Sequence, residues 1–202
     1  MTRVLFEPHA DDAVLFAAFT ILRYRPQIVI TCMESLGDYG HTDTRHAETR
    51  DAMAVLGATG CMQWYKKPPD DYMRRLEQTV HPSMLAEMKE WARNAYPDLD
   101  LQERMRRLDV AVKPSLVFAP NRKASHPDHV AVAEAAVAVF GDRLRTYHTY
   151  DANGKVRDGR EAECEPEWMQ AKLRALERSE CQIRHPSAHA FFVEDLREYL
   201  GD

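Results

Sequence analysis

Apolar runs of strand length alternate with longer apolar stretches in the first part of the chain. The run from Arg3 to Glu7 ends at Pro8, and the apolar stretch over residues 13–24 that follows has the length of a helix. Residues 27–31 then form a second run of strand length. This order predicts a strand, a helix and a second strand.

The same alternation continues toward the C-terminal part of the chain. Asp43 or Thr44 can cap a helix that reaches Leu56, and Gly57 can close it. The other expected strands are 61–65, 115–119 and 146–150, the other expected helices are 129–140 and 167–180, and the polar residues 151–165 are expected to form a loop. Strands that alternate with helices indicate an α/β fold, with a Rossmann-like, mostly parallel sheet and helices on both faces.

The length of the chain fits one domain. A chain of 202 residues can bury a sizeable core, so we expect a single domain over residues 1–202. Residues 68–109 differ in character, because they are highly charged, helical in pattern and interrupted by Pro82 and Pro97. We interpret them as a helical insertion or lid within that domain.

Charge and composition narrow the class of protein. The formal net charge is -5, so no overall basic field draws the chain to nucleic acid or to an anionic membrane surface. No run approaches the ~18 to 20 apolar residues of a membrane helix, and the first residues lack the apolar core of a secretory signal. The four cysteines are widely spread, which is typical of reduced thiols. We expect a cytoplasmic protein that acts on a small molecule, while its oligomeric state stays open.

Two short motifs follow two of the predicted strands. Pro8-His9-Ala10-Asp11-Asp12 comes after the first strand, and His126-Pro127-Asp128-His129 comes after the strand at 115–119. In open α/β sheets, ligands bind beyond the carboxyl ends of the strands, so both motifs are expected at one edge of the sheet. Position alone favours a functional site there.

The residue types in these motifs fit a metal. His9 and Asp12 can present one nitrogen and one oxygen to a single ion, and His129 can complete a set of two histidines and one carboxylate. Three protein ligands leave room for water, as catalytic zinc sites do. Zinc is the expected ion, and ferrous iron is the alternative.

Helix capping explains either motif alone equally well. A histidine or an acidic pair near the start of a helix often satisfies backbone N–H groups or the helix dipole. Two such clusters at the same edge of one sheet are harder to explain as unrelated caps, and together they favour a site.

Three segments carry a resemblance to a known family. The stretch PHADD, the pair Arg45-x-x-Glu48 and the stretch HPDH resemble the LmbE-like, or PIG-L, family of N-acetylglucosaminyl deacetylases in order and spacing. Lys172 to Leu176, followed by Cys181-Gln182, is similar to a further signature of that family, so the resemblance covers nearly the whole chain. It implies a zinc-dependent hydrolase that removes the acetyl group of an N-acetylated amino-sugar conjugate.

The resemblance also implies roles for single residues. The metal ligands would be His9, Asp12 and His129, and Asp11 would be the general base that acts on water. His126 would stabilise the oxyanion and protonate the departing amine, Asp128 would orient His126, and Arg45 would contact the sugar. Arg45 could equally be a solvated helix residue or a partner of Glu48.

Some positions depart from the family's pattern. Ala10 replaces a proline, Ala18-Phe19 replaces a glycine pair, and the loop 121–125 lacks the usual glycine or tyrosine. Arg122 and Lys123 in this loop could meet a phosphate or carboxylate of the substrate, or be solvated. An amidase with a larger or non-sugar acyl substrate, and a non-catalytic binding protein of the same fold, are therefore the alternatives.

Overall fold

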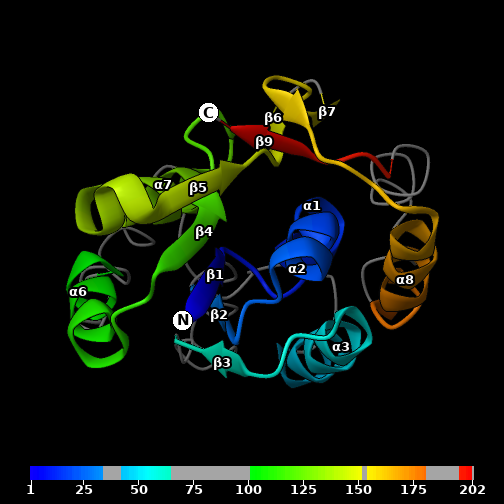
Figure 1. Cartoon of the computed structure of the whole chain (residues 1–202), viewed down its shortest axis with the longest axis horizontal. Coiled ribbons are helices and arrows are strands. Elements are labelled where there is room, and N and C mark those ends of the chain that lie inside the picture. Colours follow the sequence, from blue (N-terminus) through cyan, green and yellow to red (C-terminus); the bar gives the residue numbers. More distant parts are fainter. Residues whose placement is uncertain (34–41, 65–100, 152–153, 181–195, 202) are drawn as a thin grey trace, which may run out of the picture.

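The computed structural model describes residues 1–33, 42–64, 101–151, 154–180 and 196–201 (Figure 1). Its centre is a sheet of seven strands in the order β3-β2-β1-β4-β5-β9-β8. These strands are β1 (Arg3–Glu7), β2 (Ile28–Thr31), β3 (Cys61–Gln63), β4 (Leu116–Pro120), β5 (Leu144–Tyr147), β8 (Arg160–Glu161) and β9 (Tyr199–Gly201). The strands from β3 to β5 are parallel, and β9 runs antiparallel to both β5 and β8. The predicted mostly parallel α/β sheet is therefore confirmed.

Helices cover both faces of this sheet, as predicted. They are α1 (Asp12–Phe16), α2 (Ala18–Tyr24), α3 (Thr42–Leu56), α6 (Leu101–Val112), α7 (Pro127–Phe140) and α8 (Pro166–Leu176). Figure 1 shows α6 and α7 on one side, and α1, α2, α3 and α8 on the other. None of the helices in these ranges combines the length and apolarity that a membrane crossing requires.

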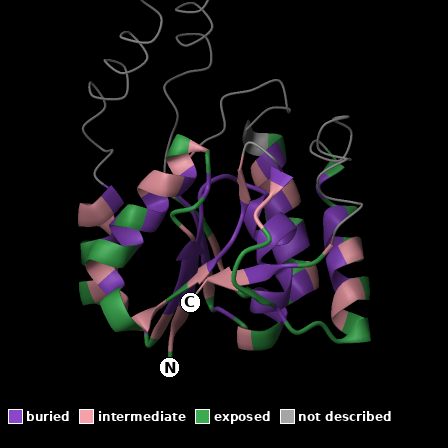
Figure 2. Ribbon diagram, turned by 90° about the horizontal axis from the view of Figure 1, so that it is seen from above, coloured by how far each residue is buried: buried purple, intermediate pink, exposed green. Residues whose placement is uncertain are grey.

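The apolar pattern of β1 explains why two layers of helices are needed. Val4 and Phe6 belong to the core beneath α6 and α7, whereas Leu5 belongs to the core beneath the other helices. All three side chains are fully buried, and burying each contributes about 1.5–3 kcal/mol. A strand that is apolar on both faces is stable only where both faces are covered. Figure 2 shows the resulting buried interior, which follows the sheet and the inward sides of the helices.

The topology reverses between β1 and β4. The chain builds β2 and β3 on one side of β1 and then crosses to place β4 and β5 on its other side. Val4 of β1 is therefore in register with Ile28 on one side and with Val117 on the other. The carboxyl ends of β1 and β4 lie side by side at this reversal, where both histidine motifs begin.

The helix expected over 13–24 is interrupted at Ala17, and that expectation of one continuous helix was wrong. Ala17 has φ -137° and ψ 18°, which ends α1 and lets α2 start at a new angle. Leu15 and Phe19 would be hydrogen-bond partners in a continuous helix, but each binds a side chain from a distant segment instead. Tertiary contacts thus override a local pattern that favours one helix.

The expected loop at 151–165 also contains more structure than its polarity suggests. A hairpin of β6 (Tyr150–Asp151) and β7 (Gly154–Lys155) lies beside the main sheet, and β8 joins the sheet edge through β9. Short polar edge strands carry little of the apolar alternation that identifies strands. Of the segment 68–109 expected as an insertion, residues 68–100 lie outside the described ranges, and the remainder lies in α6.

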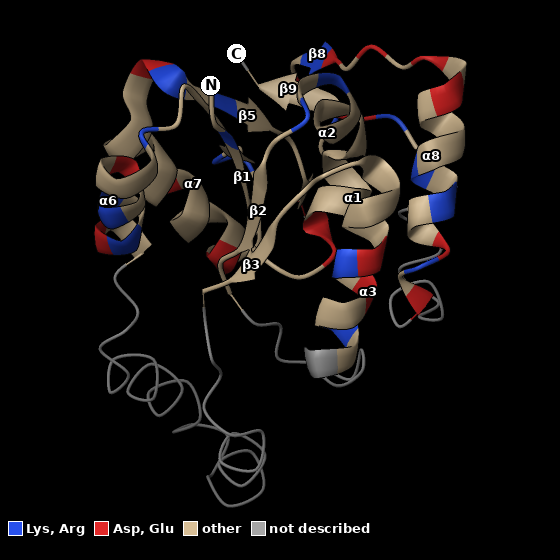
Figure 3. Ribbon diagram, turned by 60° about the horizontal axis from the view of Figure 1, so that its bottom comes forward, with Lys and Arg blue, Asp and Glu red and all other residues tan. Residues whose placement is uncertain are grey.

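Charged residues concentrate on the outer helices. In Figure 3, α6 and α8 carry residues of both signs, whereas α1 and α2 are mostly uncharged. One ion pair ties α6 to the turn before β5, because Arg143 Nη1 and Nη2 lie 2.6 and 2.9 Å from the two carboxylate oxygens of Asp109. The hydrogen bond with Arg143 holds the pKa of Asp109 below its ordinary value.

This pair gives a prediction about stability and pH. A carboxyl group whose pKa falls on folding stabilises the fold above its unfolded pKa, and this stability is lost as the pH falls through the folded pKa. We expect Asp109→Asn to lower the free energy of unfolding at neutral pH by up to about 1 kcal/mol, because solvent screens a partly exposed pair. Urea unfolding should show that the difference in the free energy of unfolding between the parent and Asp109→Asn becomes smaller as the pH falls from about 5 toward about 3. Asp142→Asn, on the adjacent turn, is the control, and a loss that does not change with pH would contradict an ionic origin.

Candidate metal centre

The turn after β1 folds back on itself and fixes the first motif. The backbone N–H of Asp11 donates to the carbonyl of His9 at 2.8 Å, and the backbone N–H of His9 donates to Asp12 Oδ2 at 2.8 Å. Asp11 is the residue before the first turn of α1, and Asp12 is the first residue of that helix. The loop thus holds His9 and the two aspartates within one tight turn.

A buried set of three side chains has the composition of a metal site. His9, Asp12 and His129 each offer one ligand atom, and these atoms all lie within 4.8 Å of one another. Asp12 Oδ2 is 3.3 Å from His9 Nδ1 and 3.3 Å from His129 Nε2. We call these three residues the inner set. The structure brings together the three residues that the sequence suggested as ligands.

His129 supports a metal most directly. Its ring is fully buried, Nδ1 contacts the hydroxyl of Thr149 at 2.9 Å, and Nε2 has no hydrogen-bond partner within the described part of the chain. Burial lowers the pKa of His129 to about 4, against the nearby charge of Asp12, so the imidazole is neutral at physiological pH. A neutral imidazole with a buried lone pair is the form that binds a metal ion.

The charges of Asp12 and His9, the other two residues of the inner set, are also consistent with a metal ion. Burial disfavours ionised Asp12, but His129 and His9 outweigh it and lower the pKa of Asp12 to about 2. Burial also opposes the charged form of His9, yet contacts with Asp12 and Asp128 raise its pKa to about 10. A proton on His9 therefore balances two carboxylates, and a divalent cation held by the inner set would take over that role. The inner set thus fits a metal ion.

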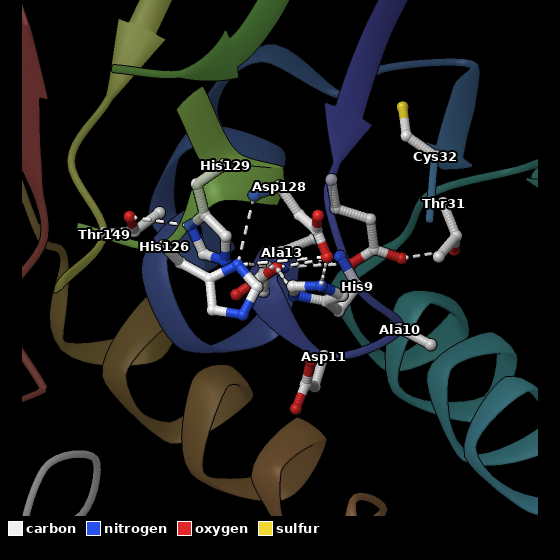
Figure 4. A network of polar contacts seen from close by, with 12 residues as sticks. His9, Ala10, Asp11, Ala13, Thr31, Cys32, His126, Asp128, His129 and Thr149 are labelled. Atoms are coloured by element: carbon white, nitrogen blue, oxygen red, sulfur yellow. Dashed lines mark hydrogen bonds and ion pairs between the residues drawn. The ribbon is translucent and has the colours of Figure 1, made fainter. Parts of the chain in front are cut away.

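The second motif adds an outer set that shares His9. His9 Nε2 lies 3.1 Å from Asp128 Oδ2, and His126 with Asp128 completes another group that could hold an ion. Side-chain exposure is 38% for His126 and 33% for Asp128, against at most 9% for the inner set. The shared ring and the greater exposure make the outer set the open side of the centre, and Figure 4 shows His126 and Asp128 beside His9 and His129.

Asp128 was expected to orient His126, and the two residues contact each other more closely through the Asp128 backbone than through its carboxylate. The Asp128 carboxylate is closer to His9, at 3.1 Å, than to His126 Nδ1, at 3.9 Å. It is the backbone N–H of Asp128 that donates to His126 Nδ1, at 3.2 Å, so His126 caps the start of α7. Because Nδ1 accepts this bond, the proton of a neutral His126 ring is at Nε2.

Asp11 stands apart from the histidines. Figure 4 shows its side chain extending away from the three rings, and its Oδ2 lies 3.0 Å from Arg45 Nη2 of α3. Both residues are buried. Burial raises the pKa of Asp11, and the positive charge of Arg45 opposes that rise. The pairing of Arg45 with Asp11, rather than with Glu48, could not be read from helix spacing.

Glu7 is a buried residue of this site that the sequence did not single out. Its Oε2 accepts the backbone N–H of Ala13 at 3.0 Å, and its Oε1 accepts the hydroxyl of Thr31 at 2.7 Å. Burial raises the pKa of Glu7 to about 8, although both hydrogen bonds oppose the rise. Glu7 therefore anchors the first turn of α1 to the end of β1. The available signal was an acidic residue directly after the apolar run Val4 to Phe6.

The loop and the hairpin next to the second motif complete the surroundings. Lys123 pairs with Asp158, and Arg122 is exposed. The ring of Tyr150, in β6, meets His129 at 5.1 Å and His126 at 6.4 Å between ring centroids. Neither Thr149 nor Tyr150 stood out in the sequence, since both belong to a segment that resembled an ordinary aromatic strand.

Comparison with known proteins adds a family and a fold. The family model of PIG-L, described as GlcNAc-PI de-N-acetylase, matches residues 4–140. No curated protein matches the chain.

Solved structures share the fold at low sequence identity. The conserved protein TT1542 of Thermus thermophilus is 17% identical with a TM-score of 0.62, over 94% of this chain and 84% of that one. The N,N'-diacetylchitobiose deacetylase of Pyrococcus horikoshii is 19% identical with a TM-score of 0.53, over 90% and 70%. GalB, the 4-carboxy-2-hydroxymuconate hydratase of Pseudomonas putida KT2440, is 14% identical with a TM-score of 0.55, over 99% and 95%. The shared fold therefore accommodates more than one reaction.

The contact between His129 and Thr149 yields a prediction for metal binding. If Nε2 binds the ion, Nδ1 keeps its proton and donates it to the Thr149 hydroxyl, which fixes the ring. We expect Thr149→Val to weaken metal affinity by about tenfold or more, as loss of such an outer partner does. Thr149→Ser keeps the hydroxyl and is the matched control. Competition with a chromophoric chelator measures the metal affinity of both variants. Equal affinities for the two variants would contradict the role of Thr149.

Proposed function

The chain belongs to the PIG-L family, described as GlcNAc-PI de-N-acetylase, and from this premise we propose that it is a zinc-dependent N-deacetylase of an amino-sugar conjugate. The match covers residues 4–140 and so includes both histidine motifs. Family membership supports hydrolytic deacetylation in general. The ion, the substrate and the roles of single residues are our proposal.

One observation carries the proposal. His129 Nε2 is buried without a hydrogen-bond partner in the described ranges, and it faces Asp12 at 3.3 Å. Leaving a buried polar atom unsatisfied costs about 1–3 kcal/mol, so such an atom needs an explanation. We propose that His129, Asp12 and His9 hold a zinc ion, with ferrous iron as the alternative. When bound, the ion would act as a Lewis acid toward the amide carbonyl and lower the pKa of water to about 7.

Asp11 is the proposed general base. It adjoins Asp12 in the chain but is engaged by Arg45, so it does not belong to the inner set. Its burial raises its pKa, which makes the carboxylate a better proton acceptor near neutral pH. The positive charge of Arg45 opposes that rise. We infer that Asp11 takes the proton from water as the oxygen adds to the acetyl carbonyl, a role that requires its side chain to turn from Arg45 toward the inner set.

His126 is the proposed acid. Its Nδ1 is occupied by the backbone of Asp128, so Nε2 is the atom that can donate a proton toward the substrate. An amine leaves poorly until its nitrogen is protonated. As the C–N bond breaks, Nε2 of His126 would supply the proton to the amine nitrogen, and the acyl carbon would leave as acetate. Asp128, between His126 and His9, would hold both rings in place.

Arg45 supports an amino-sugar as substrate. Its Nη2 binds Asp11, while its Nε is buried without a hydrogen-bond partner in the part of the chain that the structure describes. A hydroxyl group of a sugar would satisfy this donor. The family description and the name of the chitobiose deacetylase are consistent with an N-acetylated sugar, and we propose this class for the present chain.

The division of tasks between Asp11 and His129 can be tested by substitution. We expect Asp11→Asn to keep the metal and to lose turnover by at least about a hundredfold, because it removes the base alone. His129→Ala should lose the metal, because it removes a buried ligand. Metal content after desalting and acetate release from N-acetylglucosamine conjugates measure the two effects, with Asp51→Asn on the exposed side of α3 as control. An active Asp11→Asn enzyme would refute the base.

Removal and replacement of the metal test the ion and the substrate together. A strong chelator should abolish acetate release, and zinc should restore it better than ferrous iron added without oxygen. The restored enzyme should release acetate from N-acetylated amino sugars faster than longer acids from N-acyl sugars or acetate from N-acetyl amino acids. Preference for a longer acyl group or a non-sugar amine would favour the amidase alternative. Full activity in the metal-free protein would overturn the proposal.

A further inference from the structure

The break between α1 and α2 leaves two backbone groups that do not bond to each other. In a continuous helix, the Phe19 N–H would donate to the Leu15 carbonyl. Here Lys172 Nζ donates to the Leu15 carbonyl at 2.9 Å, and the Phe19 N–H donates to Glu198 Oε2 at 2.9 Å. Lys172 Nζ and Glu198 Oε1 are themselves 2.7 Å apart. A buried ion pair thus takes the place of one helical hydrogen bond.

This ion pair is completely enclosed and fully hydrogen-bonded at its cation. Lys172 and Glu198 are 1% and 0% exposed. The three donors of the Lys172 ammonium group have three acceptors, since the carbonyl of Leu196 accepts the remaining bond at 3.0 Å. Burying two charges costs more than burying apolar side chains of similar size, so such a pair is weak evidence for a role in stability alone. The hydrogen bonds that the pair makes with the backbone at the break between α1 and α2 are more informative about its role.

The pair is connected to the metal centre through a single residue. The Leu15 N–H donates to the Asp11 carbonyl at 3.0 Å, while the Leu15 carbonyl accepts from Lys172. Glu7 holds the opposite end of α1 through the Ala13 N–H. The five residues of α1 are therefore fastened at both ends, and Asp11 and Asp12 lie at its start.

We propose that Lys172 and Glu198 are positioning residues for the metal centre. By holding Ala17 in its non-helical conformation, they set the direction of α1, so that Asp12 meets His129 and Asp11 meets Arg45. Both positioning residues lie outside the stretch 4–140 that the family model matches. The inference rests on the proposed function only in taking Asp12 as a metal ligand.

A double substitution separates positioning from stability. Lys172→Met alone would leave a buried carboxylate unpaired and would endanger folding. Lys172→Met/Glu198→Leu removes both charges and fills the space with apolar groups, an exchange that is often neutral for stability. The Leu15 carbonyl and the Phe19 N–H are then expected to bond to each other, which requires helical Ala17 and redirects α1.

Two measurements follow on the folded double variant. Backbone chemical shifts of Ala17 and Phe19 in the metal-free protein should move to helical values, and zinc affinity from chelator competition should fall by about tenfold or more. Glu198→Asp keeps a charged carboxylate with two acceptor oxygens and should stay nearer than the double variant to the parent's shifts and affinity. Met105→Ala, in the core on the other face of the sheet, lowers stability without touching α1 and should leave zinc affinity unchanged.

The outcomes distinguish this inference from the proposed function. Unchanged shifts in the double variant would overturn the positioning of α1, and changed shifts with the parent's zinc affinity would overturn its link to the metal centre. A zinc affinity that falls as far in Met105→Ala would equally overturn that link. If the parent binds no metal, the proposed function fails, while the chemical shifts of the metal-free protein still decide whether the pair holds α1.

Discussion

The parallel pairing of β1 with β4 is the constraint on which the rest of the structure depends. It joins two strands that lie far apart in the sequence and makes their carboxyl ends neighbours, with Arg3 in register with Leu116. His9 and Asp128, 119 residues apart, come into contact for this reason. Each strand is apolar in its middle on both faces, and helices cover both faces. The site is a consequence of the sheet order.

Around the inner set and Asp11, charge has to be balanced locally, because these side chains are buried. Asp11 is matched by Arg45, and Asp12 is shared between His9 and His129. Two adjacent carboxylates thus reach different environments because they start a helix, where successive side chains point in different directions. Asp12 becomes a member of the inner set, and Asp11 stays beside that set with Arg45 as its cationic partner. The sequence order Asp-Asp is what makes this division possible.

The sequence predicted the sheet, the helices on both faces and the three residues that form the inner set, since these follow from apolar periodicity and from residue types after strands. It could not predict the break at Ala17, because local propensity favours a helix there and the cause lies in Lys172 and Glu198. Glu7, Thr149 and the partner of Arg45 were missed for the same reason. Their importance depends on contacts between segments that only the folded chain brings together. The roles assigned to the single site residues stay predictions.

The contact between Phe19 and Glu198 has a consequence for the order of events during synthesis. These residues are separated by 179 positions. The nascent chain can complete β1 and α1 early, but the acceptor for the Phe19 N–H leaves the ribosome only after all the central strands and α8 have been made. Until then, the hydrogen bond that Phe19 makes at the break between α1 and α2 cannot form. This fastening of the bend therefore has to wait until translation has passed residue 198.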